Sequence, residues 1–404
     1  MIGIGFQSKQ AALDNLNTMT SGVQPIIEED YRTRMTEAQA YMQANNIDAL
    51  FLNAGTNLKY FTGLDWSASE RLVGALLPAQ GEVCFIAPFF ELGTISEYQV
   101  IKGKVHAWQE EQCPYQLLGQ IFTECGISHN ATLAIDESTA FFVVDGINKA
   151  NPNLNVINGH QVTSHCRMHK SANEIALIQR AMDMTLAVQQ AAASILHEGI
   201  TTTEVESFIA QAHKKVGASG NYFCIVLFGK ASSFPHGVKE PQTLKQGDVV
   251  LIDTGCKLHG YLSDITRTYV FGKATDYQRE IWEHEKQAQL HAFNAAQIDA
   301  TCGDVDYAAR SYFAKHNLGP DYQLPGCPHR TGHGIGLDIH ERPYLVKDNP
   351  QRLAPGMCFS NEPMLVIPDQ FGIRLEDHFY ITESGPKWFT EPSYSIDDPF
   401  GLEK

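Results

Sequence analysis

The stretch LIDTGCKLHGYLSDITRT, residues 251–268, places Asp253 and Asp264 eleven positions apart, at the edges of runs rich in Leu, Ile, Val, Tyr and Thr. Two apolar runs, QGDVVLID (246–253) and YLSDITRTYVFG (261–272), flank the Gly-bounded turn TGCKLHG, a pattern typical of a β-hairpin. We therefore expect the two aspartates to lie across from each other on neighbouring strands. Aspartate is unfavourable in a strand, so the pair indicates a function.

A second hairpin pattern repeats the arrangement with two glutamates. GMCFSNEPMLVI (356–367), the turn PDQFG and IRLEDHFYI (373–381) carry Glu362 and Glu376. Four carboxylates in an apolar sheet repel one another, and their pKa values rise unless positive charge joins them. A single acid is better explained by an exposed face or a turn cap, but four acids in two matched hairpins favour a site for two divalent cations.

Nitrogen ligands for such a site are available in a Gly-rich segment. HRTGHGIGLDIHERP (329–343) contains three histidines, among them His333 and His340, and His236 lies upstream in SSFPHG. Glycines let the backbone approach a crowded centre closely. Most histidines are hydrogen-bonded structural residues, and this is our interpretation of His165, His169, His259, His329 and His378, with Cys327 beside them.

The whole chain of 404 residues suits two domains of different class. Residues 1–163 have the pattern of an α/β domain, and residues 164–404 mix helix and strand without a strict βαβ rhythm, which predicts an α+β domain with an antiparallel sheet. The boundary is placed where one long helix is expected over 164–200. Other expected helices span 29–47, about 203–216 and 276–316, and expected strands span 48–54, 82–90, 221–229, 247–253, 261–271, 357–367 and 371–382.

Composition excludes several kinds of partner. The formal net charge is −16, and an acidic chain is repelled by nucleic acid and by anionic membrane surfaces. No apolar run approaches the roughly 18–20 residues that cross a bilayer, and the first residues lack a secretory pattern, so we expect a cytoplasmic protein. Nine scattered cysteines without a CxxC spacing indicate reduced thiols and no structural zinc site.

The motifs together resemble a known family. DTG, the second aspartate in SDITRT, then HGIG, HE and P, NEP and RLED follow the order and spacing of the pita-bread metallopeptidases. This family includes methionine aminopeptidases, Xaa-Pro aminopeptidases, Xaa-Pro dipeptidases (prolidases) and the related creatinases. NLKYFTGLDWSASERLVGALL (57–77) is similar to the N-terminal domain of the creatinase and proline-directed branches, and LDIHERPYLV fits the proline-directed branch better than the methionine branch. Met364 departs from the family, which commonly has Gly there, and puts the local shape of the pocket in question.

The resemblance implies a C-terminal pita-bread domain with a curved antiparallel sheet, preceded by a creatinase-like α/β domain. It also implies a dinuclear metal site held by Asp253, Asp264, His333, Glu362 and Glu376, with Asp264 and Glu376 bridging. Creatinases lack the full set, whereas all five residues are present here. Oxygen-rich ligation with one imidazole and no thiolate suits two divalent ions of manganese, our first expectation, or of cobalt, zinc or iron. Such ions lower the pKa of a bound water to near neutrality.

Further roles are implied for residues around the metals. Glu362 would orient the attacking water and take its proton, His340 would steady the intermediate at the substrate carbonyl, and His236 would line the same pocket. Because residues two apart in a strand share a face, Arg374 should lie on the Glu376 side and Thr266 on the Asp264 side, where both would orient ligating acids. Arg374, Arg342 and Arg352 are alternatives for holding a substrate carboxylate.

We predict a cytoplasmic metallopeptidase, a homodimer acting on peptides, that hydrolyses Xaa-Pro bonds as a dipeptidase (prolidase) or an aminopeptidase. An Xaa-Pro bond has no N–H and a restricted shape, so it needs a dedicated pocket. Tyr60 and Trp66 are candidates for a rim that one subunit contributes to its partner's site, with core packing as the alternative. Two other functions stay open: a lyase of the same fold acting on dimethylsulfoniopropionate, whose relatives have altered ligands, and a peptide-binding module, whose relatives have usually lost them.

Overall fold

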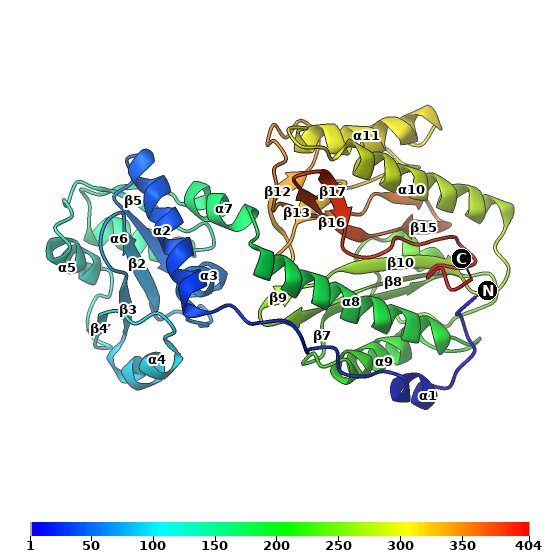
Figure 1. The fold of residues 1–404 in the computed structure, drawn as a ribbon, viewed down its shortest axis with the longest axis horizontal. Coiled ribbons are helices and arrows are strands. Elements are labelled where there is room, and N and C mark those ends of the chain that lie inside the picture. The colour runs from blue at the N-terminus through cyan, green and yellow to red at the C-terminus, as the bar shows by residue number, and fades with distance from the viewer. Residues whose placement is uncertain (1, 404) are drawn as a thin grey trace. The chain divides into compact units, whose positions relative to one another are not determined.

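The computed structural model describes residues 2–403, which divide into two compact units (Figure 1). The N-terminal unit is Ile26–Arg167, and the C-terminal unit consists of residues 2–25 and 168–403. The division therefore falls four residues after the boundary expected between 163 and 164.

The sequence division placed residues 2–25 in the N-terminal domain. In the structure they belong to the C-terminal unit. Helix α1 (Lys9–Asp14) buries Ala12 and Leu13 in an apolar cluster of the C-terminal unit. This packing is tertiary, so no local pattern in the short helix could have indicated it.

The N-terminal unit is a mixed six-stranded sheet with helices. Its strands are β1 (Ala49–Asn53), β2 (Gly74–Pro78), β3 (Cys84–Pro88), β4 (Val105–Trp108), β5 (Thr132–Ile135) and β6 (Asn155–Asn158), and its helices are α2 (Glu28–Ala44), α3 (Thr56–Thr62), α4 (Leu92–Tyr98), α5 (Gln116–Glu124), α6 (Phe141–Ala150) and α7 (His160–Met168). The strand order is β4-β3-β2-β1-β5-β6, and β1 pairs in parallel with β5 and antiparallel with β2. All residues of β1 are buried, as expected for a central strand between helices. The α/β prediction for this part is confirmed.

The C-terminal unit contains two groups of antiparallel strands. They are β7 (Asn221–Phe228), β8 (Val249–Leu258), β9 (Tyr261–Leu262), β10 (Ile265–Val270), β11 (Gly332–Gly334), β12 (Glu341–Leu345), β13 (Cys358–Asn361), β14 (Met364–Ile367), β15 (Phe371–Arg374), β16 (Asp377–Thr382) and β17 (Gly385–Trp388). The first group has the order β10-β8-β7 with β9 on β8; the second has the order β12-β11-β13-β16-β17, and β14 pairs with β15. A bridge between Thr266 and Glu376 joins the groups, so the predicted antiparallel sheet is continuous across both.

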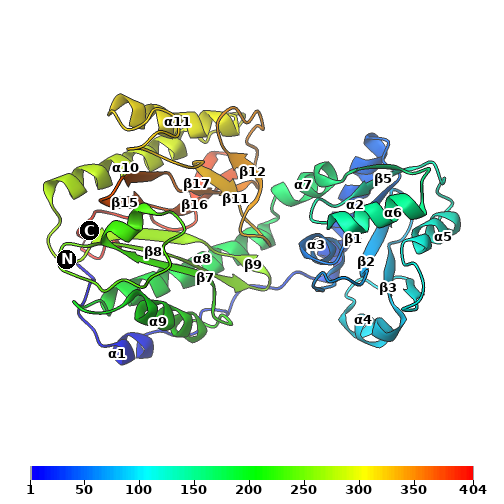
Figure 2. The same ribbon diagram turned by 180° about the vertical axis from the view of Figure 1, so that it is seen from behind.

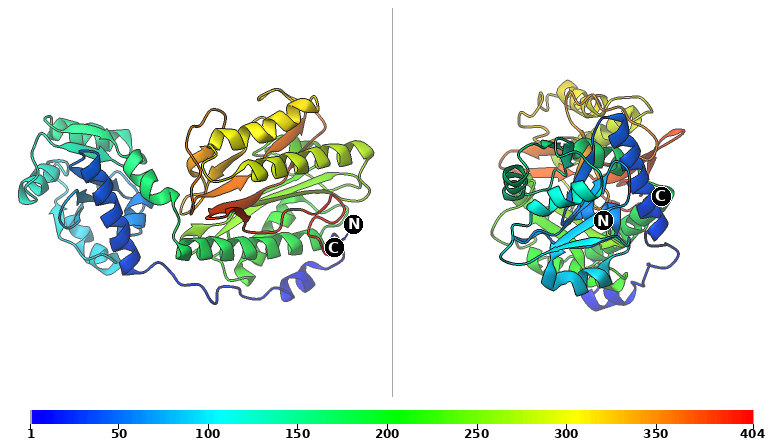
Figure 3. Two further views of the ribbon diagram at one scale, coloured as in Figure 1. Left: turned by 45° about the horizontal axis from the view of Figure 1, so that its top comes forward. Right: turned by 90° about the vertical axis from the view of Figure 1, so that its left-hand side faces the viewer.

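Four helices cover these strands on two sides. Helices α8 (Ala172–Ser194) and α9 (Thr202–Lys215) pack on β8 and β7, whereas α10 (Asp276–Ala295) packs on β13, β14 and β15 with α11 (Cys302–Lys315) beside it. Figures 1, 2 and 3 show the strands between the two helix pairs. Each side has its own apolar core, one under α8 and α9 and one under α10 and α11. Within residues 2–403, no helix combines the length and apolarity needed to cross a bilayer.

The prediction of a single helix over 164–200 is wrong, because α7 and α8 are separate helices. Ser171 starts α8 with a capping box: its side chain accepts the N–H of Glu174, and the Glu174 carboxylate accepts the N–H of Ser171. Lys170, at the break, is buried and forms a 3.0 Å salt bridge with Glu341. A cap and a buried ion pair therefore end one helix and begin the next.

A buried histidine in the C-terminal unit makes stability depend on pH. His213 on α9 is fully buried, accepts the Thr185 hydroxyl at Nε2 (3.2 Å) and donates from Nδ1 to the Ile209 carbonyl (3.2 Å). Burial lowers the pKa of His213 from 6.5 to about 4. The unfolded chain binds the proton more readily between these values, so the contribution of His213 is complete above pH 6.5 and is lost as the pH falls toward 4.

We expect the stability advantage of the wild type over His213→Gln to shrink by about 1.4 kcal/mol per pH unit, and by roughly 3 kcal/mol in total, as the pH falls through this window. Urea unfolding of both proteins at a series of pH values measures the difference. Parallel pH profiles would show that the imidazole is not held neutral by its surroundings.

Candidate metal centre

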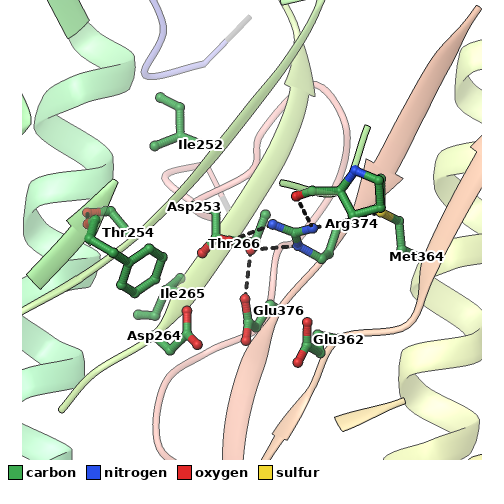
Figure 4. Close-up of polar contacts among 12 residues, drawn as sticks. Ile252, Asp253, Thr254, Asp264, Ile265, Thr266, Glu362, Met364, Arg374 and Glu376 are labelled. Atoms are coloured by element: carbon green, nitrogen blue, oxygen red, sulfur yellow. Dashed lines mark hydrogen bonds and ion pairs between the residues drawn. The ribbon is translucent and has the colours of Figure 1, made fainter. Parts of the chain in front are cut away.

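Four carboxylates from both groups of strands reach one cavity (Figure 4). Asp253 lies in β8, Asp264 directly precedes β10, Glu362 directly follows β13, and Glu376 directly precedes β16. All four line a cavity of about 470 Å³. The structure therefore brings together the four acids that the sequence analysis assigned to one site.

The second hairpin holds its acids opposite each other, as expected. One register runs through the pairs Asn361↔Asp377 and Met364↔Arg374. This register sets Glu362 opposite Glu376, and both side chains reach the cavity.

The first hairpin is offset, so the expected position of Asp264 directly across from Asp253 is wrong. Asp253 faces Thr266, two residues beyond Asp264. The chain reverses at His259 and Gly260, both with positive φ, because β8 continues to its pairing with β9 instead of ending at TGCKLHG. A tight turn replaces the longer loop and shifts the partner of Asp253.

The protein itself leaves these acids short of positive charge and of hydrogen bonds. Asp253 Oδ1, Asp264 Oδ1 and Glu376 Oε1 are buried and have no hydrogen-bond partner within residues 2–403. Burial, followed by the charges of Glu376 and Asp253, raises the pKa of Asp264 well above its ordinary value. Burial and then the charge of Glu362 do the same to the pKa of Glu376. Such a site favours either bound protons or bound cations.

Arg374 and Thr266 orient two of the four carboxylates, those of Asp253 and Glu376, as Figure 4 shows. Arg374 Nη2 donates to Asp253 Oδ2 at 2.5 Å, and its Nε donates to Thr266 Oγ1 at 3.1 Å. The Thr266 hydroxyl in turn donates to Glu376 Oε2 at 2.7 Å. The Arg374 guanidinium is buried against Asp253. This position favours a role in orienting the carboxylate over a role in binding a substrate carboxylate.

His333 points one ring nitrogen at the acids. Its Nδ1 lies 2.9 Å from the Gly334 carbonyl, and its Nε2 lies 3.0 Å from Glu362 Oε1 and 3.7 Å from Asp264 Oδ2. A backbone partner on Nδ1 leaves Nε2 as the ligand atom, the usual arrangement of a metal-binding histidine. Burial alone would raise the pKa of Glu362, but the hydrogen bond and charge of His333 lower it below its ordinary value.

Two further predicted residues, His236 and His340, line the cavity and are exposed to it. The His340 ring centroid lies 4.2 Å from that of His333. Burial, followed by the charge of His333, lowers the pKa of His340 to about 4, so its imidazole is neutral near pH 7 and keeps one N–H to donate.

The cavity also contains residues that sequence reasoning passed over. His329, interpreted as structural, and Arg330 both line it. Arg330 stacks over the Tyr344 ring, 4.2 Å from its centroid, and forms no ion pair within residues 2–403. Arg342 and Arg352, named as alternatives for a substrate carboxylate, are not among the lining residues.

His378, also interpreted as structural, lies close to the predicted ligands. It lies in β16, and ligand atoms of Asp264, His333, Glu376 and His378 all fall within 4.8 Å of one another. One signal in the sequence could have found it: His378 follows Glu376 by two residues, and alternation along a strand puts such residues on one face.

Two buried glutamines position the backbones that carry the acids. Gln189 of α8 and Gln289 of α10 are both fully buried. The Gln189 Nε2 donates to the carbonyls of Ile252 (3.0 Å) and Ile265 (2.8 Å); the Gln289 Nε2 donates to the carbonyls of Asn361 (3.3 Å) and Leu375 (3.0 Å) and to Asp377 Oδ2 (3.1 Å). Each carbonyl belongs to a neighbour of one of the four acids. Each helix therefore ties together the two strands of one hairpin.

The donor set fits divalent cations. Three buried carboxylate oxygens without partners and one imidazole nitrogen that faces the acids offer hard oxygen ligands with borderline nitrogen, and within the described residues no thiol lines the cavity. The residues that could hold the ions are Asp253, Asp264, His333, Glu362 and Glu376.

Comparison with known proteins adds an independent line of support. Residues 176–383 match metallopeptidase family M24, and residues 34–169 match the creatinase/prolidase N-terminal domain. The putative dipeptidase YkvY of Bacillus subtilis is 30% identical over 359 residues, covering 89% of this chain and 97% of YkvY. The Xaa-Pro dipeptidase of Pyrococcus furiosus is 30% identical over 365 residues, covering 89% and 98%. The crystal structure of dipeptidase PepE from Mycobacterium ulcerans superposes with a TM-score of 0.85 at 30% identity, covering 91% and 97%.

We expect Asp264→Asn to have opposite effects on stability with and without metal. In chelator-treated protein the substitution removes a buried acid that repels its neighbours, so the melting temperature should equal or exceed that of the wild type. Added Mn²⁺ or Co²⁺ at 100–1,000 times its Kd should stabilise the wild type by about 3–4 kcal/mol and the variant far less.

Thermal unfolding with chelator and with added metal measures both effects. Asp183→Asn on α8, outside the cluster, is the matched control and should show the metal response of the wild type. An equal metal response in Asp264→Asn would remove this residue from the metal centre.

Proposed function

We propose, on the premise that this chain belongs to metallopeptidase family M24, that it is an Xaa-Pro dipeptidase that uses two divalent cations. The premise agrees with the order of motifs in the sequence and with the matches over both units. The relatives named above as dipeptidases, one of them an Xaa-Pro dipeptidase, support the substrate class. A manganese centre, a homodimer and a cytoplasmic location remain predictions.

The observation that carries the proposal is the buried cluster of acids with His333 at a cavity open to substrate. Asp253, Asp264 and Glu376 each keep a buried oxygen without a partner, which a cation would satisfy. Divalent cations held there would lower the pKa of a water molecule and polarise a peptide carbonyl. A lyase or a non-catalytic relative is expected to have altered or lost ligands, whereas all five residues line this cavity.

The chain's own residues supply the proton transfers and the donors. Glu362 is placed to accept a proton from the attacking water, because its carboxylate is kept ionised by His333 and is the most exposed of the acids, at 14% of its side chain. Neutral His340 can donate its N–H to the oxyanion that forms at the substrate carbonyl. Arg374 and Thr266 hold the acids in place while charge moves.

Arg330 favours a dipeptide over a longer peptide. Its guanidinium lies over Tyr344 at the cavity wall without a carboxylate partner in the described chain, whereas the other cavity arginine, Arg374, is already paired with Asp253. A free C-terminal carboxylate of a short substrate would supply the missing partner. A volume of about 470 Å³ suits a small ligand.

A substrate panel tests the function as a whole. Di-, tri- and longer Xaa-Pro peptides, an Ala-Ala dipeptide and dimethylsulfoniopropionate would be incubated with chelated protein and with Mn²⁺, Co²⁺, Zn²⁺ or Fe²⁺ added back. We expect metal-dependent hydrolysis of Xaa-Pro dipeptides foremost. Full turnover in chelated protein, or cleavage of the sulfonium compound alone, would refute the proposal.

Glu362→Gln should lower kcat for Xaa-Pro hydrolysis by about 10²–10⁴-fold, because the amide cannot take the proton from water. Circular dichroism should show an intact fold. Glu383→Gln, an exposed acid in the turn after β16, is the control and should keep wild-type activity. Undiminished hydrolysis by Glu362→Gln would exclude it as the proton acceptor.

Arg330→Met should raise KM for an Xaa-Pro dipeptide by about 10–100-fold, the scale of one lost charge-assisted hydrogen bond, and leave KM for the corresponding Xaa-Pro amide nearly unchanged. Methionine keeps the apolar stem and removes only the charge. Arg342→Met is a matched control, because Arg342 also lies near Tyr344, at 5.8 Å, but outside the cavity. Equal changes for acid and amide would exclude a carboxylate contact.

A further inference from the structure

His378 occupies a place that its structural interpretation does not explain. It is fully buried in β16, in register with Ser360 of β13. Neither its Nδ1 nor its Nε2 has a hydrogen-bond partner within residues 2–403. A buried polar group left unpaired costs about 1–3 kcal/mol, so a histidine is a poor choice for a position that needs only packing.

The surroundings of His378 differ from those of His213, a histidine that is equally buried. His213 has a partner on each ring nitrogen, from Thr185 and from the Ile209 carbonyl. At His378 neither ring nitrogen has such a partner within residues 2–403, although the backbone of Asp264 approaches the ring and the charges of His333 and Glu362 act on it. The ring has acids and His333 around it, with the His333 ring centroid 5.9 Å away.

The distances suit one ion. Ligand atoms bonded to a single ion at about 2.0–2.2 Å lie at most about 4.4 Å apart. The ligand atoms of Asp264, His333, Glu376 and His378 already lie within 4.8 Å of one another. The four atoms are therefore close enough for movements of the side chains to bring all of them to one ion.

We propose, building on the proposed metallopeptidase function, that His378 is a second imidazole ligand of the metal centre, on the ion that His333 also binds. Its place is set by strand alternation, because Glu376 and His378 project from the same face of one strand. The ion would then have two nitrogen ligands beside the carboxylates of Asp264 and Glu376.

Two imidazoles change which metal the centre prefers. Carboxylate and water ligands suit Mn²⁺, whereas imidazole favours Zn²⁺, Co²⁺ and Fe²⁺. The affinity ratio of Co²⁺ or Zn²⁺ over Mn²⁺ should therefore be larger in this protein than the five predicted ligands alone would give. His378 accounts for the excess.

The test compares metal affinities of the wild type, His378→Gln and His213→Gln. The last is the matched control, since it makes the same change at a buried histidine outside the cluster. Chelator competition measures Kd for Co²⁺, Zn²⁺ and Mn²⁺, and the visible spectrum of the Co²⁺ protein reports its ligands. We expect His378→Gln to weaken Co²⁺ and Zn²⁺ binding about 100-fold or more and Mn²⁺ binding less than about tenfold, exceeding the 10–100-fold typical of residues that only orient ligands.

The outcomes separate this inference from the function on which it rests. An unchanged Co²⁺ spectrum with an equal loss of affinity for all three metals would show that His378 only orients other groups, and unchanged affinities would show that it only packs. Either result overturns the proposal while hydrolysis by the wild type stands. If the wild type binds no divalent cation, the proposed function fails first. His378→Asn replaces His378→Gln should the latter not fold.

Discussion

Four acids placed together in the apolar sheet of the C-terminal unit repel one another, and the rest of the site must offset this repulsion. Two unit charges about 4 Å apart repel by about 4 kcal/mol at an effective dielectric constant of 20, and four acids make several such pairs. A whole domain is stable by only about 5–15 kcal/mol. Arg374 forms its salt bridge with Asp253, and the pKa values of Asp264 and Glu376 stay raised, so these two acids need protons or cations. This shortage of positive charge destabilises the four acids on their own. The same shortage favours the binding of cations among them.

The acids stay in place only if the backbone that carries them is rigid. The two groups of strands in the C-terminal unit achieve this in the same way. Gln189 and Gln289 each use one amide nitrogen to bind carbonyls on both strands of a hairpin. Arg267, fully buried, then joins the halves by donating to the carbonyls of Thr266 and Glu376 and to Asp377 Oδ1 at 2.7 Å. Such outer partners fix ligand geometry without touching the metal.

How much the sequence could predict follows from which interactions are local. Asp253 and Glu362 were identifiable because each follows an apolar strand run in a hairpin pattern, and the order of motifs then indicated the family. The offset of Asp264 depends on a two-residue turn with positive φ at His259, which a longer Gly-bounded stretch concealed. Arg330 was missed because its contact with the Tyr344 ring depends on the pairing of β11 with β12, which no local pattern in the Gly-rich segment indicated. Contacts of this kind exist only after the sheet has closed.

Met364, which stands where the family commonly has glycine, contacts the site from outside the cavity. It is fully buried in β14 and does not line the cavity. Its Sδ lies 3.8 Å from Arg374 Nη1, the nitrogen that also donates to the Pro235 carbonyl at 3.1 Å. A glycine there would leave that side of the guanidinium without a packing neighbour. Met364 therefore contacts the arginine that holds Asp253, so its influence on the site passes through Arg374 and not through the wall of the cavity.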